Sequence, residues 1–422
     1  MKKNVFHFVF RLLNRTFALY YIIGMKFWLL TLMMWAGVLC AWAQEMPDSA
    51  SVDSTQVKDP IYISLLTCSP GREPYTLFGH TAIHMRNKKQ KGFDFVFNYG
   101  LFDYSAKNFV WRFVKGETDY ELGAEPTDFF MSRYVDEGHT VWEQELNLTP
   151  KEKEQLFGLI VWNSRPENKM YRYNFLYDNC TTRARDAFQR AMGEVRVAYP
   201  PNDDQLTFRD IIHRYTSVSP WVELGIDMVL GSEVDRPLDY RDKMFVPSRY
   251  HNLVKDATIE YPDGTAKPFV LKETVYDPTC ELKDTPGFPL SPVLTMWLVF
   301  ALTAVVSVLN LQRRKVSLWL DVLLVTAQGI AGLLVAFLFF LSEHPAVGTN
   351  WLIVLFNPLV FVLLVLMFHR KSRAYQVAEY VNLAGLVFTL LLFVLPLQQI
   401  PLALLPVVLS LLSRGFVRLK IR

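Results

Sequence analysis

Cys180 begins a short polar stretch whose residue types could activate a thiol. In YNFLYDNCTTRARD, residues 173–186, the cysteine follows Asp178 and Asn179 and precedes two threonines and two arginines. Either Asp178 or Asn179 could cap a helix that starts at Cys180. The helix dipole, the unpaired first-turn amides and Arg183 one turn along would lower the pKa of this thiol. The pattern therefore favours a nucleophilic cysteine.

His80 is the best candidate for the base that such a nucleophile needs. It opens the strand-like run HTAIHM, and a basic turn then leads to the alternating run FDFVFNYG. Pairing the two runs as a hairpin puts Asn98 or its neighbour opposite His80, where the amide could fix the imidazole tautomer. Cysteine hydrolases and acyltransferases use this set of groups. His84 is a reserve base on the same strand face, and Asp94 is a reserve orienting residue.

The other cysteines and the charge balance limit the possible functions. Of four cysteines, Cys40 falls in an apolar N-terminal segment, and Cys68 and Cys280 could form one disulfide, leaving Cys180 as the odd thiol. Cysteine and histidine also meet by chance in one domain, so a structural role stays open. No metal-ligand spacing or glycine-rich phosphate loop is present, and we expect no cofactor. The 44 basic and 41 acidic residues give no sign of a nucleic-acid partner.

The elements that must position these residues indicate a mixed α+β domain. Strands are expected at IYISLLT, from residue 61, and at HTVWEQEL further along. A helix is expected over TPKEKEQLFGLIVWN, with Thr149 as N-cap and Glu152 closing a capping box. The cysteine helix should run to Gly193 and could pack closely on a sheet through its alanines. We expect this catalytic domain to cover residues 61–286.

The N-terminal residues indicate export. The segment MKFWLLTLMMWAGVLCAWAQE, which begins at Met25, joins a lysine, an apolar stretch and a small-residue site before Gln44. This is the pattern of a cleaved signal peptide. We assign residues 1–43 to the signal, with Met25 as a possible true start, and residues 44–60 to a linker. An uncleaved signal anchor is the alternative.

Beyond residue 286 the composition becomes that of a membrane protein. Long apolar runs cover residues 287–312, 316–342, 350–368 and 380–413. The last run is divided by prolines and glutamines into two short spans, so we expect five spans. Basic residues follow the first, third and fifth spans, which places alternate loops in the cytoplasm. Residues 287–422 are therefore expected to be an all-α transmembrane domain, with residues 44–286 on the outer side.

The order of the candidate residues resembles that of a known group. A strand histidine that precedes a helix-starting cysteine is found in circularly permuted papain-like proteins, including lecithin retinol acyltransferase. The chain also resembles the Lnb-type lipoprotein N-acyltransferases of Bacteroides-like bacteria, from about residue 60 through the membrane region. The motifs that carry this likeness are TCSPGREPYTLFGHTAIHM, FNYGLFD, YNFLYDNCTTRARD and SEHPAVGTNWLIVLFNPL.

The resemblance implies a bacterial inner-membrane enzyme with a permuted papain-like catalytic domain in the periplasm. Such an enzyme moves an acyl chain from a phospholipid to the α-amino group of the diacylglyceryl-cysteine of a lipoprotein, through a cysteine thioester. Its partners would be the phospholipid donor, the diacylated lipoprotein acceptor and the membrane. Relatives are expected to have arginine where this chain has His84, so His84 is not assigned to catalysis.

Four further residues are candidates for substrate binding. Arg183 and Arg185 could hold a lipid phosphate, although arginines on exposed helices are more often only solvated. His344 and Asn350 fall at or below the outer membrane face, where polar groups are functional candidates. Asparagines that pack spans together are at least as common.

Two other functions stay open at this point. A membrane-anchored cysteine peptidase or amidase acting on cell wall would use the same Cys180 and His80. In such an enzyme the five spans would only anchor the catalytic domain. A non-catalytic membrane scaffold would need neither residue.

Overall fold

The structure is a computed structural model that describes residues 61–90, 92–102, 107–201, 204–283 and 287–421. These residues belong to one compact unit, Asp59–Arg422. The expected signal peptide of residues 1–43, with Met25 and Cys40, and the expected linker of residues 44–60 lie outside the described residues.

An antiparallel sheet dominates the first half of the described chain. Its seven strands lie in the order β10-β5-β1-β2-β3-β4-β6. They are β1 (Ile61–Cys68), β2 (His80–Asn87), β3 (Asp94–Leu101), β4 (Asp119–Pro126), β5 (Val141–Leu146), β6 (Met170–Arg172) and β10 (Val270–Tyr276). A smaller sheet joins β7 (Arg196–Ala198), β8 (Thr258–Glu260) and β9 (Ala266–Pro268). The expected strands at IYISLLT and HTVWEQEL are present as β1 and β5.

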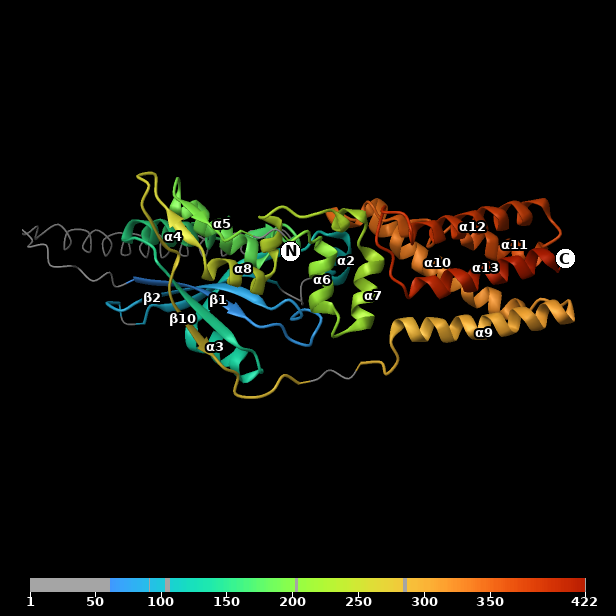
Figure 1. Cartoon of the computed structure of the whole chain (residues 1–422), viewed down its shortest axis with the longest axis horizontal. Helices are drawn as coiled ribbons and strands as arrows, with labels where there is room; N and C mark the ends of the chain where they lie inside the picture. Colours follow the sequence, from blue (N-terminus) through green and yellow to red (C-terminus); the bar gives the residue numbers. More distant parts are fainter. Residues whose placement is uncertain (1–60, 91, 103–106, 202–203, 284–286, 422) are drawn as a thin grey trace, which may run out of the picture. The chain divides into compact units, whose positions relative to one another are not determined.

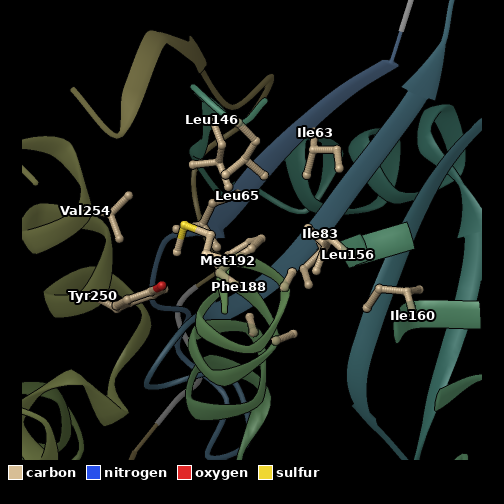
Figure 2. Close-up of a cluster of buried hydrophobic side chains, with 14 of the residues drawn as sticks. Ile63, Leu65, Ile83, Leu146, Leu156, Ile160, Phe188, Met192, Tyr250 and Val254 are labelled. Carbon is tan, nitrogen blue, oxygen red and sulfur yellow. The ribbon is translucent and has the colours of Figure 1, made fainter. Parts of the chain in front are cut away.

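Helices cover both faces of the large sheet (Figure 1). The helices of this part of the chain are, in order, α2 (Phe109–Lys115), α3 (Thr127–Asp136), α4 (Pro150–Asn163), α5 (Cys180–Met192), α6 (Phe208–Thr216), α7 (Pro220–Val229) and α8 (Pro247–Lys255), of which α3, α4, α5 and α8 pack on the sheet. The main core lies between one sheet face and helices α4, α5 and α8, and Figure 2 draws 14 of its side chains, ten of them labelled. Helix α3 covers the other face, where Phe130 packs against Leu66, Ala82 and Val96.

Strand β1 is buried on both sides because helices lie over both faces of the sheet. Ile63 and Leu65 enter the main core, whereas Leu66 and Cys68 enter the smaller core under α3. This two-sided burial explains why the strand reads as an almost continuous apolar run. The sheet and its helices confirm the expected α+β class.

Local signals in the sequence set the expected helix ends. Thr149 accepts a hydrogen bond from the backbone of Glu152, whose carboxylate accepts one from the backbone of Thr149, so the expected capping box of α4 is present. Helix α5 ends at Gly193, which has a φ of 61°. Glycine adopts this left-handed conformation with little strain, which suits a helix end.

The last third of the described chain is helical. It contains α9 (Pro292–Arg313), α10 (Leu318–Leu341), α11 (Val360–Leu366), α12 (Arg373–Leu392) and α13 (Leu404–Lys420). Among the described residues, α9, α10 and α12 are long and apolar enough to cross a membrane. The run 380–413 is divided into two helices as expected, although α12 begins earlier and α13 ends later.

The expected third span over residues 350–368 is not one helix. Short 3-10 turns occupy Pro345–Val347 and Trp351–Ile353, and the apolar helical part is only Val360–His369. Pro358 cannot donate a backbone hydrogen bond, and the Asn357 side chain donates to the carbonyl of Val354. Hydrophobic content alone does not predict this break in the helix.

Two arginines of α13 are buried in an ion-pair network. Arg414 donates twice to Asp321 of α10, at 2.8 Å each. Arg418 bridges Asp321 and Glu379 of α12, at 2.7 to 2.9 Å. All four side chains are at most 1% exposed. Arg414 and Arg418, which belong to the basic residues after the expected fifth span, are therefore neutralised by carboxylates inside the helical region.

Candidate active site

Asn179 fixes the start of α5 and therefore the position of Cys180. Its side-chain oxygen accepts from the backbone N–H groups of Thr181 and Thr182, at 2.8 and 3.0 Å. Its amide nitrogen donates to the carbonyls of Phe175 and Phe245, at 2.7 and 2.9 Å. Asn179 is thus the cap of the two residues considered from the sequence. With four hydrogen bonds, this buried amide leaves the first residue of the helix little freedom.

His80 lies at the start of β2 and is held by Asn98 of β3. Its Nε2 is 3.0 Å from the side-chain oxygen of Asn98. The register pairs Ile83 with Phe97. Asn98 therefore lies two residues from the position directly opposite His80, and the side chains meet diagonally.

The surroundings of Asn98 decide the tautomer of His80. The amide nitrogen of Asn98 donates to Glu125 Oε1 at 2.9 Å, so its oxygen faces the imidazole. An amide oxygen can only accept, so Nε2 of His80 carries a proton and donates it. This leaves Nδ1 of His80 as the nitrogen that can exchange a proton with Cys180.

Electrostatics favour a charged thiolate and imidazolium. Burial raises the pKa of Cys180, but the charge and hydrogen bond of His80, with smaller contributions from Thr81 and Thr181, bring this pKa below its ordinary value. Burial lowers the pKa of His80, but the charge and hydrogen bond of Cys180 and the hydrogen bond of Asn98 bring it above its ordinary value. Each group therefore stabilises the charge of the other.

Two charged residues, Glu125 and Arg133, support Asn98, and neither was predicted from the sequence. Arg133 of α3 donates to Glu125 Oε1 at 2.7 Å, on the same oxygen that accepts from Asn98. The guanidinium of Arg133 also lies over the ring of Tyr134, which stacks on the His80 imidazole with ring centroids 6.1 Å apart. Strand β4 was not predicted, so nothing placed Glu125 beside β3.

An aromatic cavity of about 500 Å³ opens beside Cys180 and His80. Ten of its lining residues have aromatic rings: Tyr75, Phe78, Tyr99, Phe102, Phe109, Phe113, Tyr120, Tyr173, Phe175 and Phe245. The backbone of Gly100 lies close to the thiol, because a Cβ there would be 3.8 Å from Cys180 Cβ. The cavity can therefore hold a large apolar group against the thiol.

Of the four residues predicted to bind substrate, His344 lies on the cavity wall and the other three do not. Arg183 is held by both carboxylate oxygens of Asp178 and lies over the ring of Tyr171, at 3.5 Å. Arg185 is 7% exposed and donates to Asp186 and to the carbonyl of Arg241. These contacts give neither arginine a free guanidinium at the cavity.

Asn350 has a structural environment. Its side chain donates to the carbonyl of Met228 at 2.8 Å and accepts from Leu352 and Gln398. It is 2% exposed. Asn350 therefore joins the turn after α10 to the end of α7.

The reserve residues His84 and Asp94 form a separate ion-pair cluster. His84 lies 2.6 Å from Glu143 and 2.8 Å from Asp94. Burial lowers the pKa of His84, but the two carboxylates outweigh it and raise this pKa overall. Burial raises the pKa of Glu143, but His84 outweighs it and the pKa of Glu143 falls to about 2. The two carboxylates thus favour the protonated form of His84.

The three cysteines of the described residues are free. The disulfide considered for Cys68 and Cys280 is not formed: Cys68 is buried in β1, and Cys280 is exposed and donates to the carbonyl of Asp136. The absence of a disulfide partner therefore does not single out Cys180 among these three cysteines, whereas its contacts do. Within the described residues, no group of three or more His, Cys, Asp or Glu side chains is arranged to hold a metal ion.

Two family models match the chain. The model described as Lnb N-terminal periplasmic domain matches residues 50–218, which include His80, Asn98 and Cys180. The model described as Lnb transmembrane domain matches residues 283–422. Comparisons with curated proteins and with solved structures returned no match.

Proposed function

Because the chain is an Lnb-type protein, with the periplasmic and transmembrane domains of that family in order, we propose that it is a lipoprotein N-acyltransferase. It transfers an acyl chain from a phospholipid to the α-amino group of the diacylglyceryl-cysteine of a lipoprotein. Residues 61–286 form the periplasmic catalytic domain, in a permuted papain-like arrangement. Residues 287–422 anchor it as several spans in a bacterial inner membrane, and residues 1–43 are the export signal.

In the first step, the Cys180 thiolate attacks the carbonyl carbon of a phospholipid ester. The C–S bond forms, the ester C–O bond breaks, and the imidazolium of His80 gives its Nδ1 proton to the departing lysophospholipid oxygen. The lowered pKa of Cys180 and the raised pKa of His80 support this starting state. The acyl chain is then held as a thioester.

In the second step, the lipoprotein amine attacks the thioester carbonyl. Neutral His80 takes the amine proton, the C–S bond breaks, and the Cys180 thiolate returns with an amide as product. Asn98 keeps the His80 Nε2 proton in place throughout, as its 3.0 Å contact suggests. The Thr181 and Thr182 amides already serve the Asn179 cap, so we assign the oxyanion to the backbone N–H of Cys180.

The observation that carries this proposal is the aromatic cavity beside the thiol. Its wall is formed by aromatic rings of the sheet domain together with His344, which follows the apolar helix α10. A thioester-bound acyl chain needs such an apolar space next to the nucleophile. A cell-wall peptidase or amidase would need polar groups for its substrate there, and a scaffold would need no activated thiol.

The test is mass spectrometry of a lipoprotein N-terminal peptide from cells that lack this protein. The cells are complemented with the intact chain, with Cys180→Ser or with His80→Ala. We expect the third acyl chain only with the intact chain. Cys280→Ser is the matched control, because this thiol is free and exposed, and it should behave like the intact chain.

Two results would contradict the proposal. Lipoproteins that are triacylated in every strain would show that the chain acts on something else, and cell-wall cleavage would be measured next. Full activity of Cys180→Ser, in protein made at normal levels, would remove the thioester and favour a scaffold.

A further inference from the structure

Helix α2 carries apolar side chains on two sides. Phe109 and Phe113, four residues apart, lie on the wall of the catalytic cavity. Val110 and Trp111 point elsewhere and are 72% and 57% exposed. A seven-residue helix with two apolar sides is unusual on a protein surface that faces water, where large exposed apolar patches mark contact sites.

The third side of α2 is polar and fixes its orientation. Arg112 donates to Asp119 Oδ2 at 2.9 Å and to the carbonyl of Glu117, and Lys115 pairs with the Glu117 carboxylate. Both basic residues are thus held on the side of β4. Among the described residues of the sheet domain, no such partner is found for the exposed side of Val110 and Trp111.

Trp111 contacts a helix that is apolar enough to cross a membrane. Its ring lies against Phe337 of α10, with ring centroids 4.9 Å apart. Helix α10 continues for about one more turn, to Leu341. Trp111 therefore lies at the level of the last turns of a span, the depth at which tryptophan gathers in membrane proteins.

The turn after α10 holds the C-terminal end of α2. Ser342 donates to the carbonyl of Val114 at 3.0 Å, Glu343 N–H to that of Lys115 at 2.8 Å, and His344 Nε2 to that of Phe113 at 2.9 Å. The last-turn carbonyls of a helix have no partner within the helix, so these bonds are a specific attachment. The exposed side of α2 is thus kept at the level of the span.

We propose that Val110 and Trp111 form a lipid-contacting face, called here the α2 lipid face, which lies among the acyl chains of the membrane. The donor phospholipid passes its acyl chain along this face and past Phe113, which is 47% exposed and also lines the cavity. The inference rests on the proposed acyltransferase function and adds where the donor enters. The occupant is lipid because the face continues the apolar surface of α10.

The experiment compares two donors with the purified full-length chain. The first donor is a diacyl phosphatidylethanolamine in vesicles of phosphatidylethanolamine and phosphatidylglycerol that also hold the protein. The second is p-nitrophenyl butyrate, a water-soluble ester that needs no membrane entry. The acyl thioester on Cys180 is followed by mass spectrometry in a single turnover.

Replacing the lipid face should slow only the membrane donor. For Val110→Ser with Trp111→Ser, we expect the rate with the phospholipid to fall about tenfold, because apolar contact area with the chains is lost. The rate with the soluble ester should stay within about twofold, which also reports correct folding. Val110→Leu with Trp111→Leu keeps an apolar face and should retain the phospholipid rate.

The matched control is Trp162→Ser on α4, because this tryptophan is 49% exposed and belongs to a helix of the main core. It should change neither rate. An unchanged phospholipid rate in the serine variant would overturn the inference, as would an equal fall with both donors, which would make α2 a cavity wall only. If the intact chain takes an acyl group from neither donor, the acyltransferase proposal itself fails.

Discussion

The pKa values of Cys180 and His80 each depend on the charge of the other residue. The pKa of Cys180 is lowered because the charge and hydrogen bond of His80 outweigh burial, and the pKa of His80 is raised because Cys180 and Asn98 outweigh burial. Each residue therefore favours the charged form of the other, and the two groups titrate as a coupled pair.

This pairing predicts the pH dependence of alkylation at Cys180. In the intact chain, iodoacetamide should react with Cys180 at pH 7, with a profile midpoint below that of an ordinary thiol. In His80→Ala, burial dominates, the thiol pKa rises, and the midpoint should move to higher pH. Peptide mass spectrometry measures both, with the exposed thiol of Cys280 as an internal reference. An unmoved midpoint would mean that His80 does not set the thiol pKa.

Glu125 is expected to act through Asn98 as a positioning residue. Glu125→Gln replaces a charged acceptor by a neutral one, which should weaken the orientation of Asn98 and slow acyl transfer about fivefold, or about 1 kcal/mol. The imidazolium loses support, so the alkaline limb of the pH–rate profile should shift to lower pH. Glu121→Gln on the same strand is the control, since Glu121 pairs with Lys169. A slower rate with an unshifted limb would indicate a structural role alone.

The sequence predicts the central residues because their signals are local. A capped helix start at Cys180 and a hairpin that brings His80 near Asn98 need only neighbouring residues. Glu125 and Arg133 belong to elements whose packing depends on distant parts of the chain. Arg183 was taken as the activating charge because it lies one turn along, but it is bound to Asp178.

At the scale of elements, helix α5 packs on the sheet through small residues. Ala184 and Ala187 are almost fully buried in the main core, as the alanines of this helix suggested. Close packing lets the first turn of α5 reach β2, where Thr181 and Thr81 share a hydrogen bond of 2.9 Å. The cap and the glycine stop predicted this helix. The apolar run over residues 350–368 predicted one span that is not one helix, because apolar content does not reveal the polar side chains that satisfy a broken backbone.

The buried charges of α10, α12 and α13 give an element-scale prediction. Asp321→Asn leaves Arg414 without a carboxylate and should cost about 3–5 kcal/mol, the usual effect of breaking a buried pair. Adding Arg414→Gln should restore much of this, because Arg418 keeps Glu379. Apparent unfolding temperatures in detergent measure the effect. Arg313→Gln at an exposed helix end should be neutral, and equal stability of single and double variants would refute the coupling.

At the scale of the whole described unit, the sheet domain is joined to the membrane helices by backbone contacts. Gly231 donates to the carbonyl of Ala346 at 2.7 Å, and a Cβ at Gly231 would lie 2.6 to 2.7 Å from the backbone of Thr349 and Asn350. Gln398 adds hydrogen bonds to Leu230 and Asn350. The bonds of Gly231 to Ala346 and of Gln398 to Leu230 join residues more than one hundred positions apart, so no local pattern could predict this junction.

Gly231→Ala should therefore disturb the junction and leave the thiol intact. We expect a several-fold loss of phospholipid-dependent acylation, with the alkylation profile of Cys180 unchanged, because the backbone contact cannot yield without a shift. Gly225→Ala on α7 is the control, since nothing lies within 4 Å of a Cβ there. Equal loss of alkylation would mean that the change unfolds the catalytic domain.

The paired charges of α13 also constrain how the protein is made. Arginines are costly inside a bilayer unless carboxylates neutralise them, so we expect Arg414 and Arg418 to insert only when Asp321 of α10 and Glu379 of α12 are beside them. We therefore expect α13 to insert after α10 and α12. A reporter fused after α13 should show efficient insertion behind α10 to α12 and poor insertion when Asp321 and Glu379 are both neutralised.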